Sequence, residues 1–313
     1  MEDLNGTTIS EIIVLGFSDL RDFQPELFVI FLIFYLVSLL GNLLITAIII
    51  LEPRLHTPMY FFLSNLSALD ILCSSSAIPK MLHNLLTKKN TISFSGCMVQ
   101  LYLFTSFLGT ELSLLAVMSY DRYVAICQPM RYPLIMNKRV CACLAAVVWF
   151  IGTFNSVLLT ALMFRLSFCG PNVIKHFFCE IPPILKLSCS DTSVNDFATL
   201  IADLLLGITC FLLTLVSYIC IISSIVKIRS NAKKKKAFST CASHLSVVAV
   251  FYGTVIYTYV RPILPHSMDD DKIVSVMYTI VSPLLNPLIY SLRNKEVIQA
   301  FTKLWKKVFL QKT

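Results

Sequence analysis

Three charged side chains interrupt a long apolar stretch that runs from Phe94 to Cys127. Glu111 lies near the middle of this stretch, and Asp121 and Arg122 are adjacent near its end. An ionised group at bilayer depth costs roughly 2.5–3.5 kcal/mol on insertion scales, so each charge needs a partner or a function. Taken alone, the Asp121-Arg122 pair is equally consistent with a helix that simply leaves the membrane at this point.

The spacing along this stretch puts its acid and its base on one face of a helix. Six residues follow one another at intervals of 4, 3, 4, 3 and 4 positions, as expected for 3.6 residues per turn. They are Phe104, Leu108, Glu111, Leu115, Met118 and Arg122. At 1.5 Å per residue the acid and the base are roughly 16 Å apart, which is too far for a direct bond. They therefore need different partners.

Asp70, in the preceding apolar segment, is the expected companion of Glu111. Two carboxylates near mid-membrane must share a cation, a proton or a hydrogen-bond network with groups such as Asn42 and Asn286. The alternative is a structural polar cluster in which one of the two acids stays protonated.

The composition places the chain among integral membrane proteins. Hydrophobic residues make up 56% of the 313 positions, charged residues 14%, and the mean hydropathy is +0.75. The net charge is +8, but the basic residues fall between the apolar segments and after the last one. This distribution is typical of a cytoplasmic membrane face, so no nucleic-acid partner is expected. The N-terminal residues lack the pattern of a cleavable signal, so we expect the first membrane helix to direct targeting.

Seven apolar segments are long enough to cross a bilayer, which takes about 20 helical residues for ~30 Å of hydrocarbon. The sequence therefore predicts an all-α membrane protein, a seven-transmembrane helix bundle. The expected spans are residues 27–51, 59–82, 100–127, 140–164, 197–226, 239–260 and 273–292. Residues 1–26 would form an N-terminal segment, 27–292 the transmembrane domain and 293–313 a tail.

The loop charges predict the orientation of the chain. With the N-terminus outside, the inner segments hold more than twice as many Lys and Arg residues as the outer ones, which is the bias of cytoplasmic loops. Asn5-Gly6-Thr7 is a glycosylation sequon in the segment that would then be extracellular. After the last span, apolar residues recur at helical spacing beside lysines, which predicts a short amphipathic helix on the cytoplasmic membrane surface. These residues are Val297, Phe301, Leu304 and Val308.

Four cysteines lie on the side that would be oxidising. Cys97 opens the third span, and Cys169, Cys179 and Cys189 lie in the connection over residues 165–196. Four cysteines allow three connectivities, and spacing alone does not separate them. The remaining cysteines fall in spans or at the inner face, where we expect small buried hydrophobic side chains.

The motifs together resemble the rhodopsin-like G-protein-coupled receptors over essentially the whole chain. The residues that carry this resemblance are Gly41-Asn42, Asp70, Cys97 with Cys179, Asp121-Arg122-Tyr123, Trp149 and Asn286-Pro287-Leu288-Ile289-Tyr290. The longer sequence motifs are similar to those of one branch of this family, the olfactory receptors. These motifs are PMYFFLSNLS at 58–67, MSYDRYVAIC at 118–127, Tyr132-Pro133, Ser217-Tyr218, KAFSTCASH at 236–244, FYGT at 251–254 and PLLNPLIYSLRN at 283–294. Ser119 stands where the family more often has Ala.

The resemblance implies roles at the matched positions. It implies a Cys97–Cys179 disulfide and a second bridge, Cys169–Cys189. The residues it assigns to activation and G-protein coupling are Asp121, Arg122, Tyr123, Tyr218, Asn286, Pro287 and Tyr290. In this scheme Arg122 leaves Asp121, helped by Tyr218 and Tyr290, and opens a cytoplasmic cavity to a heterotrimeric G protein.

The same resemblance implies an odorant receptor in the plasma membrane, extracellular at its N-terminus and cytoplasmic at its C-terminus. It would activate a stimulatory, olfactory-type G protein and raise cAMP. It would have no enzyme activity and no cofactor beyond a sodium ion, because Asp70 and Glu111 are similar to the sodium site of the family. Besides the odorant and the G protein, its partners would be membrane lipids. Lys233–Lys236 would contact either anionic lipid or the G protein.

A ligand pocket is expected in the outer half of the bundle. Helix bundles bind small molecules between helices, in mostly apolar cavities with a few polar groups. The predicted lining is Leu101, Phe104, Thr105, Leu108, Gly109, Asp203, Leu206, Val255, Ile256, Tyr259, Val276 and Thr279. Asp203 has two interpretations: an acid at the membrane interface that faces water, or a pocket residue that selects polar or basic ligands.

A transporter or a channel without G-protein coupling is the alternative class. A transporter commonly has two related halves, and the sequence shows no internal repeat. A channel needs a polar ring that lines a pore, and an intramembrane enzyme needs a nucleophile with a base or a metal cluster. His244, near the inner end of the sixth span, supplies neither.

Overall fold

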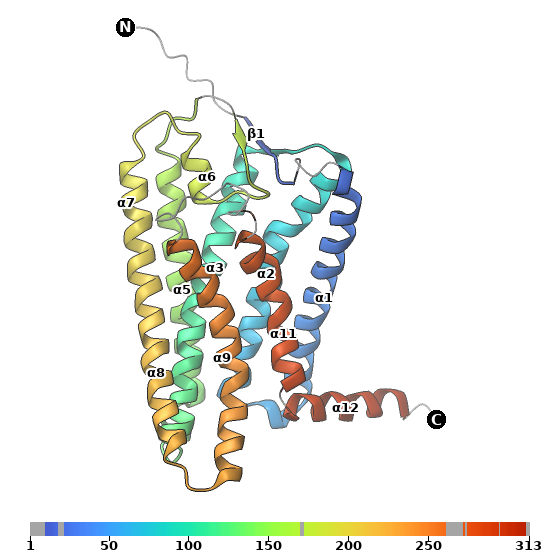
Figure 1. Cartoon of the computed structure of the whole chain (residues 1–313), viewed down its shortest axis with the longest axis vertical. Coiled ribbons are helices and arrows are strands. Elements are labelled where there is room, and N and C mark those ends of the chain that lie inside the picture. Colours follow the sequence, from blue (N-terminus) through green and yellow to red (C-terminus); the bar gives the residue numbers. More distant parts are fainter. Residues whose placement is uncertain are drawn as a thin grey trace.

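The computed structural model is a bundle of long helices that run side by side (Figure 1). It describes residues 10–17, 22–169, 172–260, 272, 274–293 and 295–310, and within these ranges it leaves out the side chains at 233, 236, 239–240, 255–260, 290–293, 295, 305 and 307–310. The first four long helices are α1 (Gln24–Leu51), α2 (Pro58–Thr87), α3 (Phe94–Cys127) and α5 (Lys138–Met163). Next comes a continuous helix made of α7 (Ser193–Ala202), the π-helical segment η3 (Asp203–Ile208) and α8 (Thr209–Val226). It is followed by α9 (Asn231–Val260), the π-helical η5 (Met277–Val281), α11 (Ser282–Arg293) and α12 (Lys295–Leu310).

Several of these helices have the length and composition of membrane spans. Among the described residues, α1, α2, α3, α5 and the continuous helix Ser193–Val226 qualify, and Cys241–Thr254 and Val274–Ile289 are shorter apolar helical stretches. Large apolar side chains such as Leu40, Phe150 and Leu205 point outward and are more than 60% exposed. So many exposed apolar side chains on a helix bundle indicate that lipid, rather than water, surrounds it.

The helices extend beyond the predicted spans at several ends. α2 ends at Thr87 instead of residue 82, α3 begins at Phe94 instead of residue 100, and α9 begins at Asn231 instead of residue 239. Hydropathy marks only the part of a helix that matches hydrocarbon, whereas polar turns continue outside it. The start of α3 shows the reason locally, because the Ser93 hydroxyl accepts a hydrogen bond from the Gly96 N–H at 3.1 Å and caps the helix.

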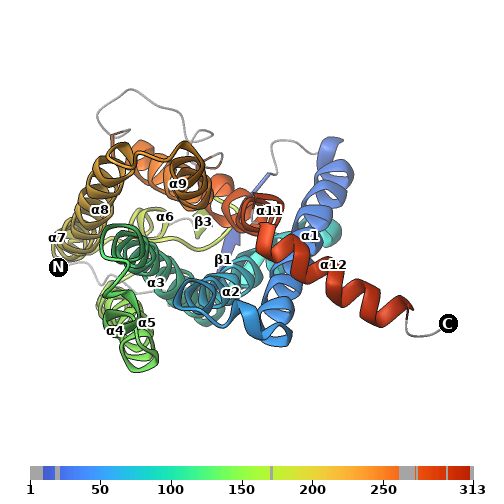
Figure 2. The ribbon, with the colours of Figure 1, turned by 90° about the horizontal axis from the view of Figure 1, so that it is seen from below.

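α3 is the central helix of the bundle. It packs against α2, α5, α8 and α9, and Figure 2 shows it among these helices from below. Within its most apolar window 67% of residues are buried, against 22% in α1, which lies at the edge of the bundle. The charges of α3 are therefore surrounded by protein.

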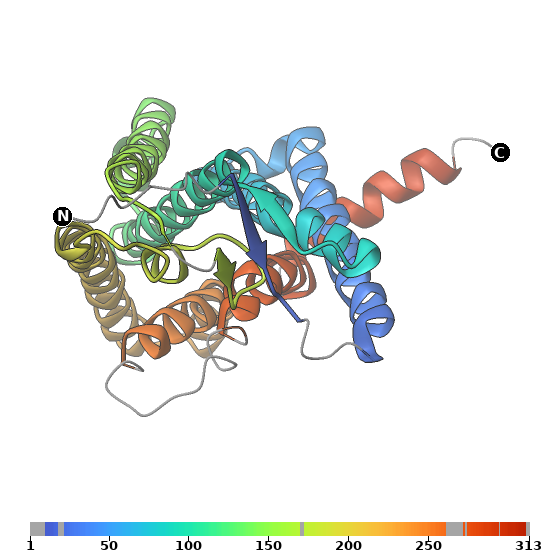
Figure 3. The same ribbon diagram turned by 90° about the horizontal axis from the view of Figure 1, so that it is seen from above.

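A small sheet lies across one end of the bundle (Figure 3). β1 (Glu11–Val14) lies between β2 (Thr91–Ser93), to which it is antiparallel, and β3 (Val173–Ile174), to which it is parallel. Ile12 and Val14 alternate inward and are buried. The N-terminal segment thus packs on the bundle and joins two connections at this end. This end is called the outer end and the opposite one the inner end, after the expected orientation. Two short helices complete the fold, α4 (Tyr132–Ile135) and α6 (Ile181–Leu185).

The proline motif of α11 fits against α1. Pro287 has no N–H, so the Pro283 carbonyl one turn earlier lacks its helical donor. Ser38 Oγ and Asn42 Nδ2 both donate to this carbonyl, each at 3.1 Å. A Cβ at Gly41 would lie 3.2 Å from the Pro287 ring. The Gly41-Asn42 pair and the proline therefore form one helix contact.

α12 runs across the opposite end of the bundle from the sheet (Figure 1). Val297 and Ala300 are buried against the bundle, whereas Ile298 and Phe301 are exposed. Tyr60 donates a hydrogen bond to Glu296 at 2.7 Å. A second polar contact joins Lys303 Nζ to Glu52, also at 2.7 Å.

Candidate functional site

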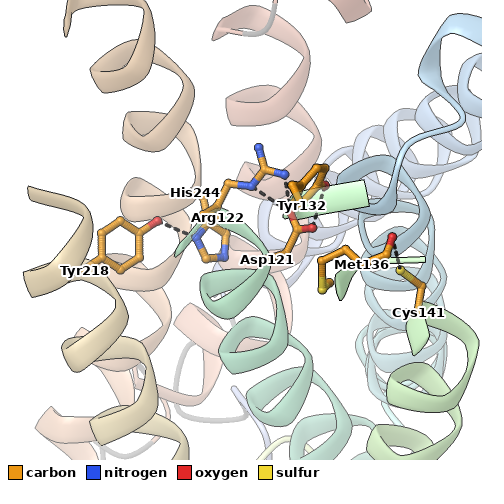
Figure 4. Close-up of polar contacts among 7 residues, drawn as sticks. All are labelled: Asp121, Arg122, Tyr132, Met136, Cys141, Tyr218 and His244. Carbon is orange, nitrogen blue, oxygen red and sulfur yellow. Dashed lines mark hydrogen bonds and ion pairs between the residues drawn. The ribbon is translucent and has the colours of Figure 1, made fainter. Parts of the chain in front are cut away.

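The Asp121 carboxylate accepts hydrogen bonds from two side chains (Figure 4). Arg122 donates to Oδ2 through Nε at 2.9 Å and through Nη2, and Tyr132 of α4 donates to Oδ1 at 2.9 Å. Asp121 is fully buried and Arg122 is 8% exposed. A buried charge pair of this kind is held by paired hydrogen bonds, and removal of either partner leaves an uncompensated charge. This arrangement is more than a membrane boundary, since donors from two elements satisfy the acid.

A second polar contact joins α8 to α9 beside this pair. The Tyr218 hydroxyl lies 2.5 Å from His244 Nδ1, and both residues are buried. Since a phenol is the better donor, the hydroxyl donates to Nδ1 and the ring proton sits on Nε2. Around this contact Ile221, Ile225 and Cys241 form a hydrophobic cluster, against which side chains at the end of α3 pack. The inner ends of α3, α8 and α9 are therefore packed against one another.

Asp70 and Glu111 are both buried, at 0% and 1% exposure, in the middle of the bundle. Asn286 Nδ2 donates to both oxygens of Asp70, at 3.0 and 3.1 Å. Asn42 instead bonds the backbone of α1 and the Pro283 carbonyl, so it belongs to the neighbouring helix contact. Among the described residues, Glu111 Oε1 has no hydrogen-bond donor. An orphaned buried carboxylate oxygen beside a second carboxylate fits a proton or a small cation.

The stripe predicted on the third span faces inward. Five of its six members are buried, and Leu108 is half-buried. Phe104 belongs to the hydrophobic cluster nearer the sheet, Leu115 and Met118 belong to the cluster nearer Arg122, and Leu108 packs against both. One face of α3 thus connects the outer core with Arg122.

Two disulfides hold the long outer connection between α5 and α7. Cys97 is bonded to Cys179 and Cys169 to Cys189, with Cα atoms 5.5 and 5.8 Å apart. The Cys179 N–H also donates to Gln100 Oε1 at 2.9 Å. This connection is thereby fixed to the outer end of α3.

A polar chain ties the same connection to the helix that begins at residue 274. Tyr278 donates to Glu180 Oε1 at 2.7 Å, and its oxygen lies 2.6 Å from Ser275 Oγ. Ser275 Oγ lies 3.0 Å from His176 Nε2. Because the Tyr278 proton goes to Glu180, Ser275 donates to Tyr278 and His176 Nε2–H donates to Ser275. Burial lowers the pKa of His176 to about 4, so the ring is neutral at physiological pH.

An aromatic cluster lies beneath this chain. The Phe104 ring lies 4.8 Å from Phe178 and 5.7 Å from Tyr278. Leu108 and Val276 pack against the same cluster. Three of the predicted lining residues, Phe104, Leu108 and Val276, are thus brought together.

The other predicted lining residues whose side chains are described lie outside this aromatic cluster, in several different surroundings. Leu101 packs with the Cys97–Cys179 bridge in a separate cluster, and Thr279 is fully buried with its hydroxyl bonded to the Ser275 carbonyl at 2.5 Å. Leu206 meets Gly109, where an added Cβ would lie 3.4 Å from it. Thr105 and Asp203 are half-buried, and Asp203 opens η3.

Some predicted residues lie outside the described parts of the chain. Asn5 precedes the first described residue, and the side chains of Val255, Ile256, Tyr259 and Tyr290 are not described. Tyr123 packs against the inner clusters of α3 and α8, and Pro287 against Gly41.

Sequence reasoning missed the residues that join elements. Phe178, Tyr278 and Glu180 were not predicted as site residues, and His244 was assigned no role. The buried aromatic pair beside Cys179 was a signal, because a disulfide next to Phe-Phe fixes aromatic side chains close to α3. Partners for Tyr278 and His244 come from distant segments, so the sequence held no comparable signal for them.

Comparison with known proteins agrees with these motifs. The family model described as Olfactory receptor matches residues 31–311. Olfactory receptor 5AP2 of Mus musculus is 50% identical over 304 residues, which cover 97% of this chain and 96% of that protein. Olfactory receptor 13G1 of Homo sapiens is 49% identical over 302 residues, covering 96% and 98%, and Olfactory receptor 13A1 of Homo sapiens is 50% identical over 301 residues, covering 96% and 92%. This chain, a multi-pass membrane protein, therefore belongs to the olfactory receptor family.

Proposed function

We propose that this protein is an odorant receptor that binds a small organic molecule between the outer halves of its helices and activates a stimulatory, olfactory-type G protein, which raises cAMP. The observation that carries the proposal is the pair of polar contacts at the inner ends of three helices, Asp121 with Arg122 and Tyr218 with His244. An arginine held in this way is available to a cytoplasmic partner only after its helix neighbours move apart.

The proposed topology has seven spans, an extracellular N-terminus and a cytoplasmic C-terminus in the plasma membrane. It is supported by the positions of β1 and α12 at opposite ends of the bundle (Figure 1) and by the excess of Lys and Arg in the segments on the α12 side. Asn5 would be glycosylated on the outside. The exposed Ile298 and Phe301 of α12 would lie on the inner leaflet, with the exposed Lys306 towards its anionic lipids.

The proposed mechanism begins in the outer aromatic cluster. A ligand that contacts Phe104 or Leu108 acts on the same face of α3 that carries Arg122. A shift of α3, α8 or α9 would separate Tyr218 from His244 and free Arg122 for the G protein. Tyr290 would assist from α11. The movement requires differential binding of the ligand to the two states, because a ligand shifts an equilibrium only by that difference.

A sodium ion is proposed between Asp70 and Glu111. The orphaned Glu111 oxygen and the two carboxylates fit a cation, while Asn286 neutralises none of their charge. The ion would supply a positive charge that holds α2, α3 and α11 together in the resting receptor. Asp70→Asn would then abolish sodium-dependent changes in agonist potency.

The test uses cells that express the full chain with a cAMP reporter and a diverse odorant panel. We expect agonist-dependent cAMP in the wild type and none with Arg122→Ala at equal surface expression. Tyr120→Phe, an exposed tyrosine on the same helix, is the matched control and should respond normally. Normal cAMP from Arg122→Ala, or ion flux or uptake by purified protein without a G protein, would favour the channel or transporter class instead.

A further inference from the structure

Two adjacent phenylalanines of the outer connection, whose rings lie 5.0 Å from each other, have different further neighbours. Phe177 and Phe178 are both buried, at 3% and 1% exposure. The Phe178 ring lies 4.8 Å from Phe104 of α3, edge to face. The Phe177 ring stacks on Phe17 of the N-terminal segment at 5.6 Å, and Phe17 in turn contacts Phe31 of α1. Identical side chains at neighbouring positions therefore serve two different contacts.

The backbone that carries both rings is held independently of them. The Gly16 N–H donates to the His176 carbonyl at 2.9 Å. On the other side, Cys179 is bonded to Cys97 and donates its N–H to Gln100 at 2.9 Å. Truncation of a ring should therefore leave the path of the loop intact and open only the space that the ring filled.

Phe178 lies directly above the stripe that leads to the inner arginine. Phe104 is the outermost apolar member of that stripe, and Leu108 follows one turn further in. Tyr278 closes the same cluster from the side of η5, where Ser275 and Glu180 fix its hydroxyl. A molecule that lies along Leu108 and Phe104 would meet the edge of the Phe178 ring at its outer end.

We infer that Phe178 is a specificity-determining residue that closes the outer end of the odorant pocket and limits the length of the ligand, whereas Phe177 only anchors the loop. This inference rests on the proposed function, because the pocket is part of that proposal. The surface that Phe178 offers is apolar and uncharged. The ligand end beneath it should therefore be a hydrocarbon chain or ring, with any polar group directed elsewhere.

The first experiment needs no agonist. Leu108→Cys is introduced into the otherwise natural chain and labelled on intact cells with a membrane-impermeant methanethiosulfonate. Adding Phe178→Ala should accelerate labelling about tenfold or more, because a close-packed ring blocks even small solutes. Adding Phe177→Ala should leave the rate unchanged, and the receptor without the added thiol gives the background. Equal acceleration by both truncations, or none by Phe178→Ala, overturns the inference.

The second experiment measures ligand length. Straight-chain aliphatic alcohols and aldehydes of four to twelve carbons are tested for cAMP responses in the wild type, Phe178→Ala and Phe177→Ala. The longest active homologue should gain two or more carbons in Phe178→Ala alone. If Phe178→Ala does not reach the cell surface, Phe178→Leu replaces it in both experiments, with the same direction expected. Absence of any cAMP response to all odorants contradicts the proposed function, and the labelling rates then still decide whether Phe178 closes this site.

Discussion

At the scale of single residues, the proposed release of Arg122 would depend on the Asp121 carboxylate, which accepts hydrogen bonds from both Arg122 and Tyr132. Once the guanidinium departs, Tyr132 is the remaining donor that the structure shows for this buried acid. Burial and the nearby Asp121 charge raise the pKa of Tyr132 above its usual value, so the phenol keeps its proton and can donate. In the proposed mechanism Tyr132 would therefore stabilise the state in which Arg122 is free.

Tyr132→Phe should accordingly reduce signalling. A hydrogen bond to a charged group contributes roughly 1.5–3 kcal/mol, and its loss matters most when no arginine compensates. We expect agonist potency in the cAMP assay to fall about tenfold at unchanged surface expression. A tenfold change corresponds to about 1.4 kcal/mol. Tyr120→Phe is the control and should keep its potency. An unchanged or increased potency in Tyr132→Phe would show that this hydroxyl does not support the activated state.

In the proposed mechanism His244 would have the opposite role, because its contact with Tyr218 would hold the closed state. His244→Phe keeps a ring in the buried site but removes the acceptor at Nδ1. Loss of a buried hydrogen bond costs about 1 kcal/mol and destabilises only the closed arrangement, so basal cAMP should rise about fivefold. Ser246→Ala, in the same helix, alters a hydroxyl that donates to its own helix at Ala242 and should leave basal cAMP unchanged. Unaltered basal cAMP in His244→Phe would contradict this role.

At the scale of elements, glycine sets how closely α3 and α5 approach. A Cβ at Gly152 would lie 2.6 Å from the Ser106 carbonyl oxygen and 2.7 Å from the Thr110 nitrogen. Backbone atoms cannot move aside as a flexible side chain can. Gly152→Ala should therefore separate the two helices and cost about 1–3 kcal/mol of stability.

We predict that Gly152→Ala is expressed at a lower level on the cell surface. Its midpoint of thermal unfolding, measured on the detergent-solubilised protein, should also be lower than that of the wild type. Gly207→Ala is the matched control, because a Cβ there would meet no atom within 4 Å in the described structure. The control should match the wild type or exceed it slightly, since alanine favours a helix. Equal midpoints for Gly152→Ala and the control would mean that the helices adapt without cost.

The elements themselves were largely predictable, but their contacts were not. Apolar length alone located the helices, and the intervals along α3 predicted the buried face that carries Glu111. Sequence could not show that Asn42 donates to the Pro283 carbonyl or that Gly41 lies against Pro287, because both contacts depend on where α11 lies beside α1. It also gave no sign of β1, since a strand of four residues is defined by its partners in two distant loops.

At the scale of the whole molecule, three segments that are far apart in the chain meet around His176. They are the N-terminal strand, the connection after α5 and the helix from residue 274, and together they are called the outer cap. The His176 carbonyl accepts a hydrogen bond from the Gly16 N–H, and its ring donates one to Ser275. The cap is therefore expected to influence the stability of the entire bundle. Because the imidazole of His176 is buried and neutral, we expect this region to be sensitive to acid.

Acid should destabilise the receptor through His176. The pKa of this residue is lowered by burial to about 4, whereas an unfolded histidine titrates near 6.5. Between these values the unfolded chain binds more protons, so the free energy of unfolding falls as pH decreases from about 6.5 to 4, by about 3 kcal/mol in total. Above pH 6.5 this contribution is fully present. We expect the thermal midpoint of the solubilised wild type to drop across this window, measured at half-unit steps.

His176→Gln should flatten that dependence, even if its midpoint at neutral pH is lower through lost packing on Phe177 and Phe178. His83→Gln, an exposed histidine at the outer end of α2, should keep the slope of the wild type. If His176→Gln and the wild type lost the same number of degrees between pH 6.5 and 4, other groups would dominate the acid response. In that case the cap would not be linked to bundle stability through this imidazole, although its hydrogen bonds to Ser275 and Gly16 would still define its geometry.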